Sequence, residues 1–154
     1  MLPSAYRIIY IEPFQNKIPI NQEVSERLGF QTSLPRLEGD VTRGVYDQFL
    51  FDGNLRVTTK PAEADLKISG NILDFSRQAL RQAPNQTVEE YRLNLVASVS
   101  LRNREGALVW EEPNVIGDTT YFVTGPSAKD ESVAVKELIT DFSRRVVERV
   151  VENW

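Results

Sequence analysis

The sequence predicts an α+β fold in which two long helices pack on one face of a mixed, mostly antiparallel sheet, a two-layer α/β sandwich. Three observations support this prediction. Residues 91–102 alternate apolar and polar side chains, as in a strand with one covered face. Two other segments repeat apolar residues every three or four positions, as amphipathic helices do. The long strand and the longer helix match in length, at about 40 Å and about 34 Å. We expect a single domain over residues 1–154.

Short strands are expected on either side of the first helix. Residues 6–11 form a β-branched and aromatic run, and residues 15–33 follow as a long polar connection. Later strands are expected at 55–59 and 66–80, the second interrupted by a bulge at Gly70. The strand at 6–11 and the strand at 55–59 flank a helix, so these two strands should be parallel with a right-handed crossover. The other strands should be antiparallel.

A long β-hairpin is the clearest local prediction. A polar loop at 81–88 leads into the alternating strand at 91–102, which ends at a turn over 103–106. Residues 107–112 form the returning strand, and we expect it to resume within 114–124 after a break. The hairpin therefore supplies most of the antiparallel sheet.

Both helices show an apolar stripe and capping residues. The first follows Ser33 as its N-cap and ends at Gly53, where a left-handed C-cap is expected. The second spans 131–153 and is capped by Asp130 or Ser127. The stripe of the first helix is Leu34, Leu37, Val41, Val45 and Phe49, and that of the second is Val135, Leu138, Ile139, Phe142, Val146, Val150 and Trp154.

The composition excludes most catalytic chemistry. The chain has no His and no Cys, so it cannot form a Ser-His-Asp or Cys-His triad or an ordinary zinc site. It carries 18 Lys and Arg against 22 Asp and Glu, a net charge of −4, and thus lacks the basic excess that favours nucleic-acid binding. We expect no catalytic residue, no metal and no cofactor.

Three further motifs have simple structural explanations. Gly39 and Gly44 are spaced like the glycines of a phosphate-binding loop, but the Lys and Ser/Thr of that loop are missing. Acidic neighbours such as Glu89 and Glu90 point to opposite faces of a strand. Basic and acidic residues interleave at helical spacing near the C-terminus, which indicates a solvated ion-pair face. That face comprises Asp141, Arg144, Arg145, Glu148, Arg149 and Glu152.

Cations near the loops at the ends of the sheet are the remaining candidates for ligand binding. Arg77 and Arg81 lie beside the loop that joins two long strands, and Lys129 ends the loop over 125–129 that leads into the last helix. Such cations can bind a phosphorylated or carboxylated ligand. Exposed Arg and Lys are also common without any ligand, so composition alone favours the interpretation without one.

Several segments, taken in order, resemble one family. They are residues 7–14 followed by Asn16, the turn at 52–57, and the segments 88–93, 109–111 and 149–154. Together they are similar to the lipopolysaccharide-assembly outer-membrane lipoproteins, the LptE family, over most of the chain. The fold of that family, two helices against a mostly antiparallel sheet, agrees with the sandwich derived from periodicity.

The resemblance implies a non-enzymatic role. Family members are lipid-anchored on the periplasmic side of the outer membrane, plug and help assemble the LptD β-barrel, and contact lipopolysaccharide. Lys129 matches a family Lys associated with lipopolysaccharide, and residues 81–87 match the strand-tip loop implicated with it. Pro84 and Asn85 stand where a basic residue is expected, so Arg81 or Arg77 would serve instead. The anchoring Cys is absent, and we expect it to precede Met1.

The polar side of the alternating strand is the expected contact with the barrel, because it stays uncovered if both helices lie on the other side. Its residues are Arg92, Asn94, Ser98 and Ser100. An alternative is a periplasmic lipoprotein that activates a peptidoglycan synthase, since such domains begin with a similar strand-Pro-Phe-Asn segment. A third is a carboxylate-based glycan hydrolase, which requires two facing acidic side chains that the sequence does not supply.

Overall fold

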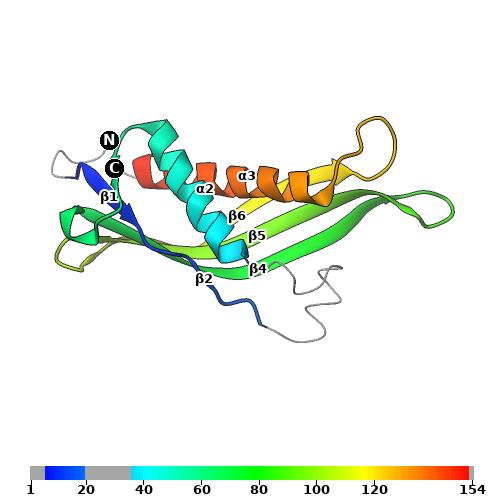
Figure 1. Ribbon diagram of the computed structural model, residues 1–154. Coiled ribbons are helices and arrows are strands. Elements are labelled where there is room, and N and C mark those ends of the chain that lie inside the picture. Colours follow the sequence, from blue (N-terminus) through cyan, green and yellow to red (C-terminus); the bar gives the residue numbers. More distant parts are fainter. Residues whose placement is uncertain (1–5, 20–35, 153–154) are drawn as a thin grey trace.

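Two helices, α2 (Leu37–Asp52) and α3 (Glu131–Glu152), lie on the same face of a six-stranded sheet (Figure 1). The computed structural model describes residues 6–19 and 36–152. This arrangement confirms the predicted α+β two-layer sandwich. The strands are β1 (Ile8–Ile11), β2 (Gln15–Asn16), β3 (Arg56–Thr58), β4 (Leu66–Gln82), β5 (Val88–Asn103) and β6 (Leu108–Phe122), with a short 3-10 helix η1 (Pro61–Glu63) between β3 and β4.

The strand order is β3-β1-β4-β5-β6, and β2 pairs with β4. β1 and β3 are parallel, as predicted. β1 and β2 also run parallel to β4, so the prediction that all other strands are antiparallel is wrong. After the short strand β3, the segment that contains η1 returns the chain to the start of β1. There the Asp65 carboxylate accepts hydrogen bonds from the backbone N–H groups of Arg7 and Ile8, both at 3.0 Å. β4 then continues in the direction of β1.

The long hairpin forms as predicted, and the expected break in its returning strand is a bulge. Leu93, Leu95, Ala97, Val99 and Leu101 are fully buried beneath the helices. β6 continues through the proline: Glu112 pairs with Val99 and Val115 with Ala97, so residues 113 and 114 face a single residue of β5. A proline, which has no N–H, is tolerated at a bulge on an edge strand.

Gly70 has a different role from the predicted one. It pairs in register with Val99, and the nearest irregularity of β4 falls between Ile72 and Asp74. The ring of Phe14 covers Gly70, where a Cβ atom would lie 2.3 Å from the ring atom Cε2. The glycine therefore makes room for a buried aromatic ring, and Phe14 is further held by an N–H bond of 2.8 Å to Thr42 of α2.

The helices follow their predicted stripes closely. Leu37, Val41, Val45 and Phe49 of α2 are buried, and Gly53 adopts the predicted left-handed cap with φ 77°. Ser33, the predicted N-cap, lies outside the described residues, as do Leu34 and Trp154; the described helix has Arg36 at its N-cap position. α3 buries a wider stripe than predicted, because it contacts both the sheet and α2. The additional buried residues are Ala134, Ser143 and Val147.

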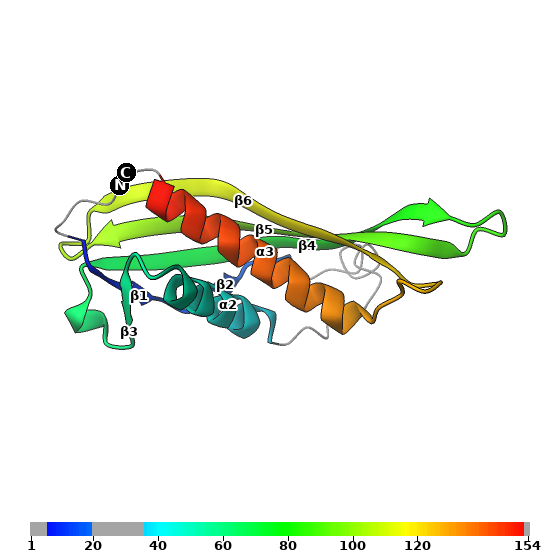
Figure 2. The same cartoon turned by 90° about the horizontal axis from the view of Figure 1, so that it is seen from above.

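Glycines allow α3 to approach its two neighbours closely. At Gly117 of β6 an added Cβ would lie 2.6 Å from Cβ of Phe142 and 2.8 Å from its Cα, so the helix backbone rests on the strand there. At Gly44 of α2 an added Cβ would lie 2.6 Å from Cγ2 of Ile139. Figure 2 shows α3 running obliquely over β5 and β6 with α2 beside it. The packing of both layers thus depends on positions without side chains.

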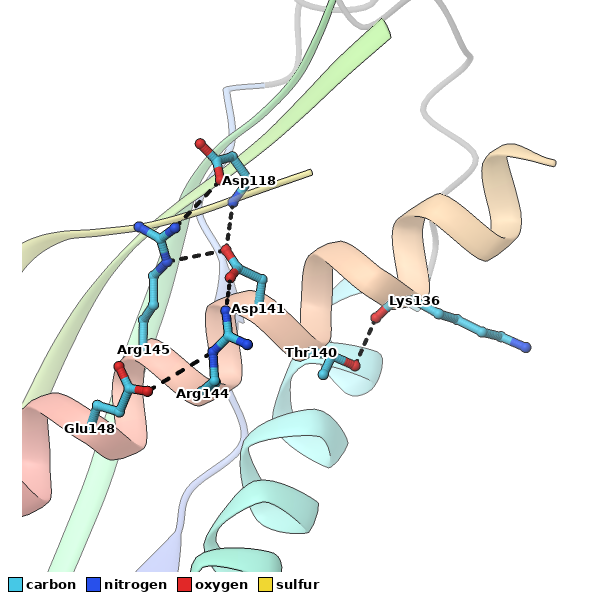
Figure 3. Close-up of polar contacts among 7 residues, drawn as sticks. All are labelled: Asp118, Lys136, Thr140, Asp141, Arg144, Arg145 and Glu148. Atoms are coloured by element: carbon cyan, nitrogen blue, oxygen red, sulfur yellow. Dashed lines mark hydrogen bonds and ion pairs between the residues drawn. The ribbon is translucent and has the colours of Figure 1, made fainter. Parts of the chain in front are cut away.

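An ion-pair network beside Gly117 ties α3 to the edge of the sheet (Figure 3). The backbone N–H of Asp118 donates to the Asp141 carboxylate at 3.0 Å, which occupies an edge donor of β6. Arg145 contacts both carboxylates, at 3.1 Å for Asp141 and 3.4 Å for Asp118, and Arg144 pairs with Asp141 and Glu148. The predicted ion-pair face is therefore present, but Arg145 also reaches from the helix to β6.

Replacing Gly117 with Ala should destabilise the protein, because the new methyl group meets the backbone of α3. Overpacking of this kind costs about 1–3 kcal/mol. Gly39→Ala is the matched control, since it lies in α2 with no atom within 4 Å of an added Cβ; it should be neutral or stabilising by up to about 1 kcal/mol. Urea unfolding measures both, and equal stability of the two variants would contradict the close contact.

Candidate functional site

The β4–β5 hairpin projects beyond the helices at one end of the molecule (Figure 2). Its turn is closed by N–H bonds from Ala83 to the Thr87 carbonyl and from Gln86 to the Ala83 carbonyl, both 2.8 Å. Arg81 and Gln82 still belong to β4, so the connecting loop is shorter than predicted. Arg81 is exposed on this projecting arm.

Arg77 lies behind the arm, in a cluster that fastens the start of α3 to the sheet. Its Nη1 atom lies 3.0 Å from Oε1 of Glu131, and its guanidinium carbon lies 4.3 Å from the centre of the Tyr91 ring. The hydroxyl of Tyr121 donates to the same Glu131 oxygen at 2.9 Å. The Arg77 side chain is only 21% exposed. The Arg77 guanidinium is therefore bound to Glu131 and largely shielded from solvent.

Electrostatics shifts the pKa values of two members of this cluster, Tyr121 and Arg77. Burial, together with the hydrogen bond to the Glu131 carboxylate and its negative charge, raises the pKa of Tyr121 to about 12. Burial opposes the charge of Arg77, but its hydrogen bond with Tyr121 and the charge of Glu131 outweigh this, so the pKa of the guanidinium is raised. The phenol thus stays a donor and the Arg a cation near neutral pH.

Arg81 and Lys129 converge on Phe122, the last residue of β6. The Arg81 guanidinium carbon lies 6.0 Å from the Phe122 ring centre, and the backbone N–H of Lys129 donates to the Phe122 carbonyl at 3.0 Å. The Lys129 ammonium pairs with both Glu137 oxygens at 2.9 and 3.0 Å. Arg81 makes no ion pair within the described residues. Of the three predicted cations, Arg81 has the most open charge.

Sequence reasoning misses the residues that surround these cations. Phe122 and Tyr91 are visible in the sequence only as residues of high strand propensity, and Glu131 and Glu137 as ordinary acids of an amphipathic helix. Their partners lie far away in the sequence, so no spacing rule indicates them. The 40% exposure of Leu80, next to Arg81, also has no signal in the sequence; it places an apolar side chain beside the open cation.

The predicted partner surface lies on the face of the sheet opposite α2 and α3, which no helix of the described residues covers. Arg92, Asn94, Ser98 and Ser100 alternate with the buried residues of β5 and therefore point away from the helices. The centre of this face is less polar than predicted: Val96 pairs with Ile116, which is 46% exposed, and Leu73 in the nearby bulge is 38% exposed. Val96 is an apolar residue at a position where the alternation places polar side chains. It is therefore the one feature of this strand in the sequence that indicates an apolar centre.

The part of the chain that the structure describes contains no cluster of metal ligands. Among residues 6–19 and 36–152, no group of three acidic or other metal-ligating side chains could hold an ion. In the same ranges neither helix is long and apolar enough to cross a bilayer. A groove of about 650 Å³ is lined by residues of α2 and α3 where the two helices meet. Two of its carboxylates already have basic partners, Glu131 with Arg77 and Asp47 with Arg43.

Comparison with known proteins identifies a family and a fold. The family model for lipopolysaccharide assembly, LptE, matches residues 6–153. No curated protein matches the chain significantly. Several solved structures share the fold, among them the following three. A minor lipoprotein from Acinetobacter baumannii has 13% identity and a TM-score of 0.54, covering 97% of this chain and 95% of its own. A hypothetical protein from Chlamydia trachomatis has 11% identity and a TM-score of 0.58, and the match covers 94% of this chain and 95% of its own. A variant of PelC from Paraburkholderia phytofirmans, solved as a dodecamer, has 14% identity and a TM-score of 0.53, and the match covers 93% of this chain and 90% of its own.

Replacing Arg77 with Met should lower the free energy of unfolding, because Glu131 loses its partly buried partner. The loss of a hydrogen bond to a charged group predicts a decrease of about 1–3 kcal/mol. Arg81→Met removes an exposed cation of the same strand and should change stability by about 0.5 kcal/mol or less. Denaturant unfolding of the two variants tests the assignment; an equal effect would show that Arg77 does not fasten α3.

Proposed function

The chain belongs to the lipopolysaccharide-assembly family LptE, and we propose that it acts as a non-enzymatic lipoprotein on the periplasmic side of the outer membrane. A lipid anchor of the kind that lipoproteins carry holds it there. It fills the lumen of an LptD-type β-barrel, helps that barrel assemble and binds lipopolysaccharide on its way to the cell surface. The family match over residues 6–153 carries this proposal. It also favours lipopolysaccharide assembly over the activation of a peptidoglycan synthase.

The projecting end supports a role in binding lipopolysaccharide. Lipid A and core phosphates are anionic, and Arg can bind a phosphate with two parallel hydrogen bonds. Arg81 offers an open guanidinium beside the Phe122 ring. The backbone of Lys129 is bonded to the same residue, and its ammonium pairs with Glu137. Each charge-assisted contact contributes roughly 1.5–3 kcal/mol, so two contacts together contribute about 3–6 kcal/mol to binding. No deep pocket is required.

Arg77 contributes to this site indirectly. Its ion pair with Glu131 is partly buried behind the arm, so the guanidinium is not available to a ligand in this arrangement. It holds the first turn of α3 against β4, and the loop that carries Lys129 enters that turn. We therefore assign a positioning role to Arg77 and direct contact to Arg81. The better exposed Lys129 joins Arg81 when its ammonium exchanges Glu137 for a phosphate of the ligand.

The uncovered face of the sheet supports a contact with the barrel. Its polar residues Arg92, Asn94, Ser98 and Ser100 surround the apolar centre at Val96 and Ile116. An apolar centre within a polar rim is the usual anatomy of a protein interface. A rigid two-layer sandwich also resists compression, which suits a protein that fills a lumen.

Replacing Arg81 and Lys129 together with Asp should weaken the binding of lipopolysaccharide by about tenfold or more, because two phosphate contacts are lost. Lys17→Asp with Arg56→Asp is the matched control: both cations are exposed, and neither has an ion pair within the described part of the chain. Fluorescence titration with lipopolysaccharide measures affinity, and circular dichroism checks the fold. Unchanged affinity of the first variant would contradict the assignment of these residues.

A further inference from the structure

A second pair of cations lies at the opposite end of the sheet from the projecting hairpin. Lys67 of β4 and Arg102 of β5 are directly opposed in the antiparallel register. Their neighbours Leu66, Ile68 and Leu101 are fully buried under the helices. Because side chains alternate along a strand, both cations point to the uncovered face. This pair lies next to the β5–β6 turn. Figures 1 and 2 show that the β5–β6 turn and the β4–β5 turn lie at opposite ends of the sheet.

No carboxylate of the described residues forms an ion pair with these two cations. Within residues 6–19 and 36–152, Lys67 and Arg102 both lack such a partner, and the nearby Arg104 is taken by Asp65 at 3.4 Å. Like charges opposed across two strands are destabilising. A protein of net charge −4 has many acidic residues that could relieve this repulsion, yet none in the described ranges pairs with either cation. An anion that binds between the two cations would relieve it.

The hairpin turn holds Arg102 in place. Its Nη1 atom donates to the Gly106 carbonyl at 3.0 Å, so the guanidinium is oriented before any ligand arrives. A hollow of about 260 Å³ lies over the pair, and its walls include Ser69, Arg104 and Glu12. Glu12 offsets one positive charge, which leaves the hollow positive overall. Leu108, opposite Arg102 and 47% exposed, adds an apolar edge.

We propose that this hollow binds a phosphate group through Lys67 and Arg102, with the Ser69 hydroxyl as a further donor. Both the headgroup of an anionic phospholipid and a free phosphate have this chemistry. Lys67 and Arg81 are separated along β4 by about 45 Å, from the rise of a strand. The hollow is therefore distinct from the cations of the projecting end, and the proposal does not depend on their function.

The test compares the protein with its variant Lys67→Glu/Arg102→Glu. Binding is measured by flotation with vesicles of phosphatidylglycerol and phosphatidylcholine, with vesicles of phosphatidylcholine alone, and by calorimetry with inorganic phosphate. The unaltered protein should bind phosphatidylglycerol vesicles or phosphate, and the variant should bind at least about tenfold more weakly. Binding to vesicles only would identify a lipid headgroup, and binding to phosphate a small anion.

Controls separate this site from general charge effects. Arg36→Glu/Lys136→Glu makes the same change in net charge at exposed positions of the helical layer and should bind like the unaltered protein. Lys67→Gln/Arg102→Gln should lose binding without adding negative charge, and thermal unfolding checks that both variants fold. Equal binding by the Lys67 and Arg36 variants, or no binding to either ligand by the unaltered protein, overturns the proposal. Lipopolysaccharide titration of the Lys67 variant shows separately whether the projecting end still works.

Discussion

The contact between α3 and β6 at Gly117 is the constraint on which the rest of the structure depends. Phe142 brings the helix backbone onto the strand, where any larger residue than Gly would push it away. At that distance Asp141 reaches the edge N–H of Asp118, and Arg145 reaches both carboxylates. Farther along the helix Arg149 pairs with Glu112 of β6. The contact thus covers part of a sheet edge that would otherwise be open to pairing with another chain.

The same contact determines where the candidate ligand-binding end lies. α3 starts above the sheet because it is held along β6, and its first turn places Glu131 between Arg77 and Tyr121. The loop before it is then tied to the end of β6, through the bond from Lys129 to Phe122. The hairpin arm with Arg81 extends past this anchored region (Figure 2). The molecule therefore has two parts: a body in which α3 is bonded to the sheet, and the β4–β5 hairpin that projects from it.

Periodicity predicts the elements, because burial follows the strand and helix repeats directly: the alternation from Leu93 to Leu101 and the stripe from Leu37 to Phe49 are both buried as expected. Positions that depend on contacts distant in sequence cannot be predicted in this way. A glycine within a strand suggests a bulge at Gly70. Its actual role is to make room for Phe14, which is distant in the sequence, so no local pattern predicts the contact. Likewise the sequence presents Lys129 as an open cation, because its pairing with Glu137 requires the loop to fold back on the helix.

We propose that lipopolysaccharide contacts the projecting end of the molecule and not the opposite end of the helical layer. A photo-crosslinking amino acid placed at Leu80 beside Arg81, or at Leu50 in α2, tests it directly, because both side chains are exposed, at 40% and 53%. Irradiation in cells that assemble lipopolysaccharide should give a lipopolysaccharide adduct at position 80 and little or none at position 50. Adducts of equal yield at both positions, or at position 50 alone, would contradict the account.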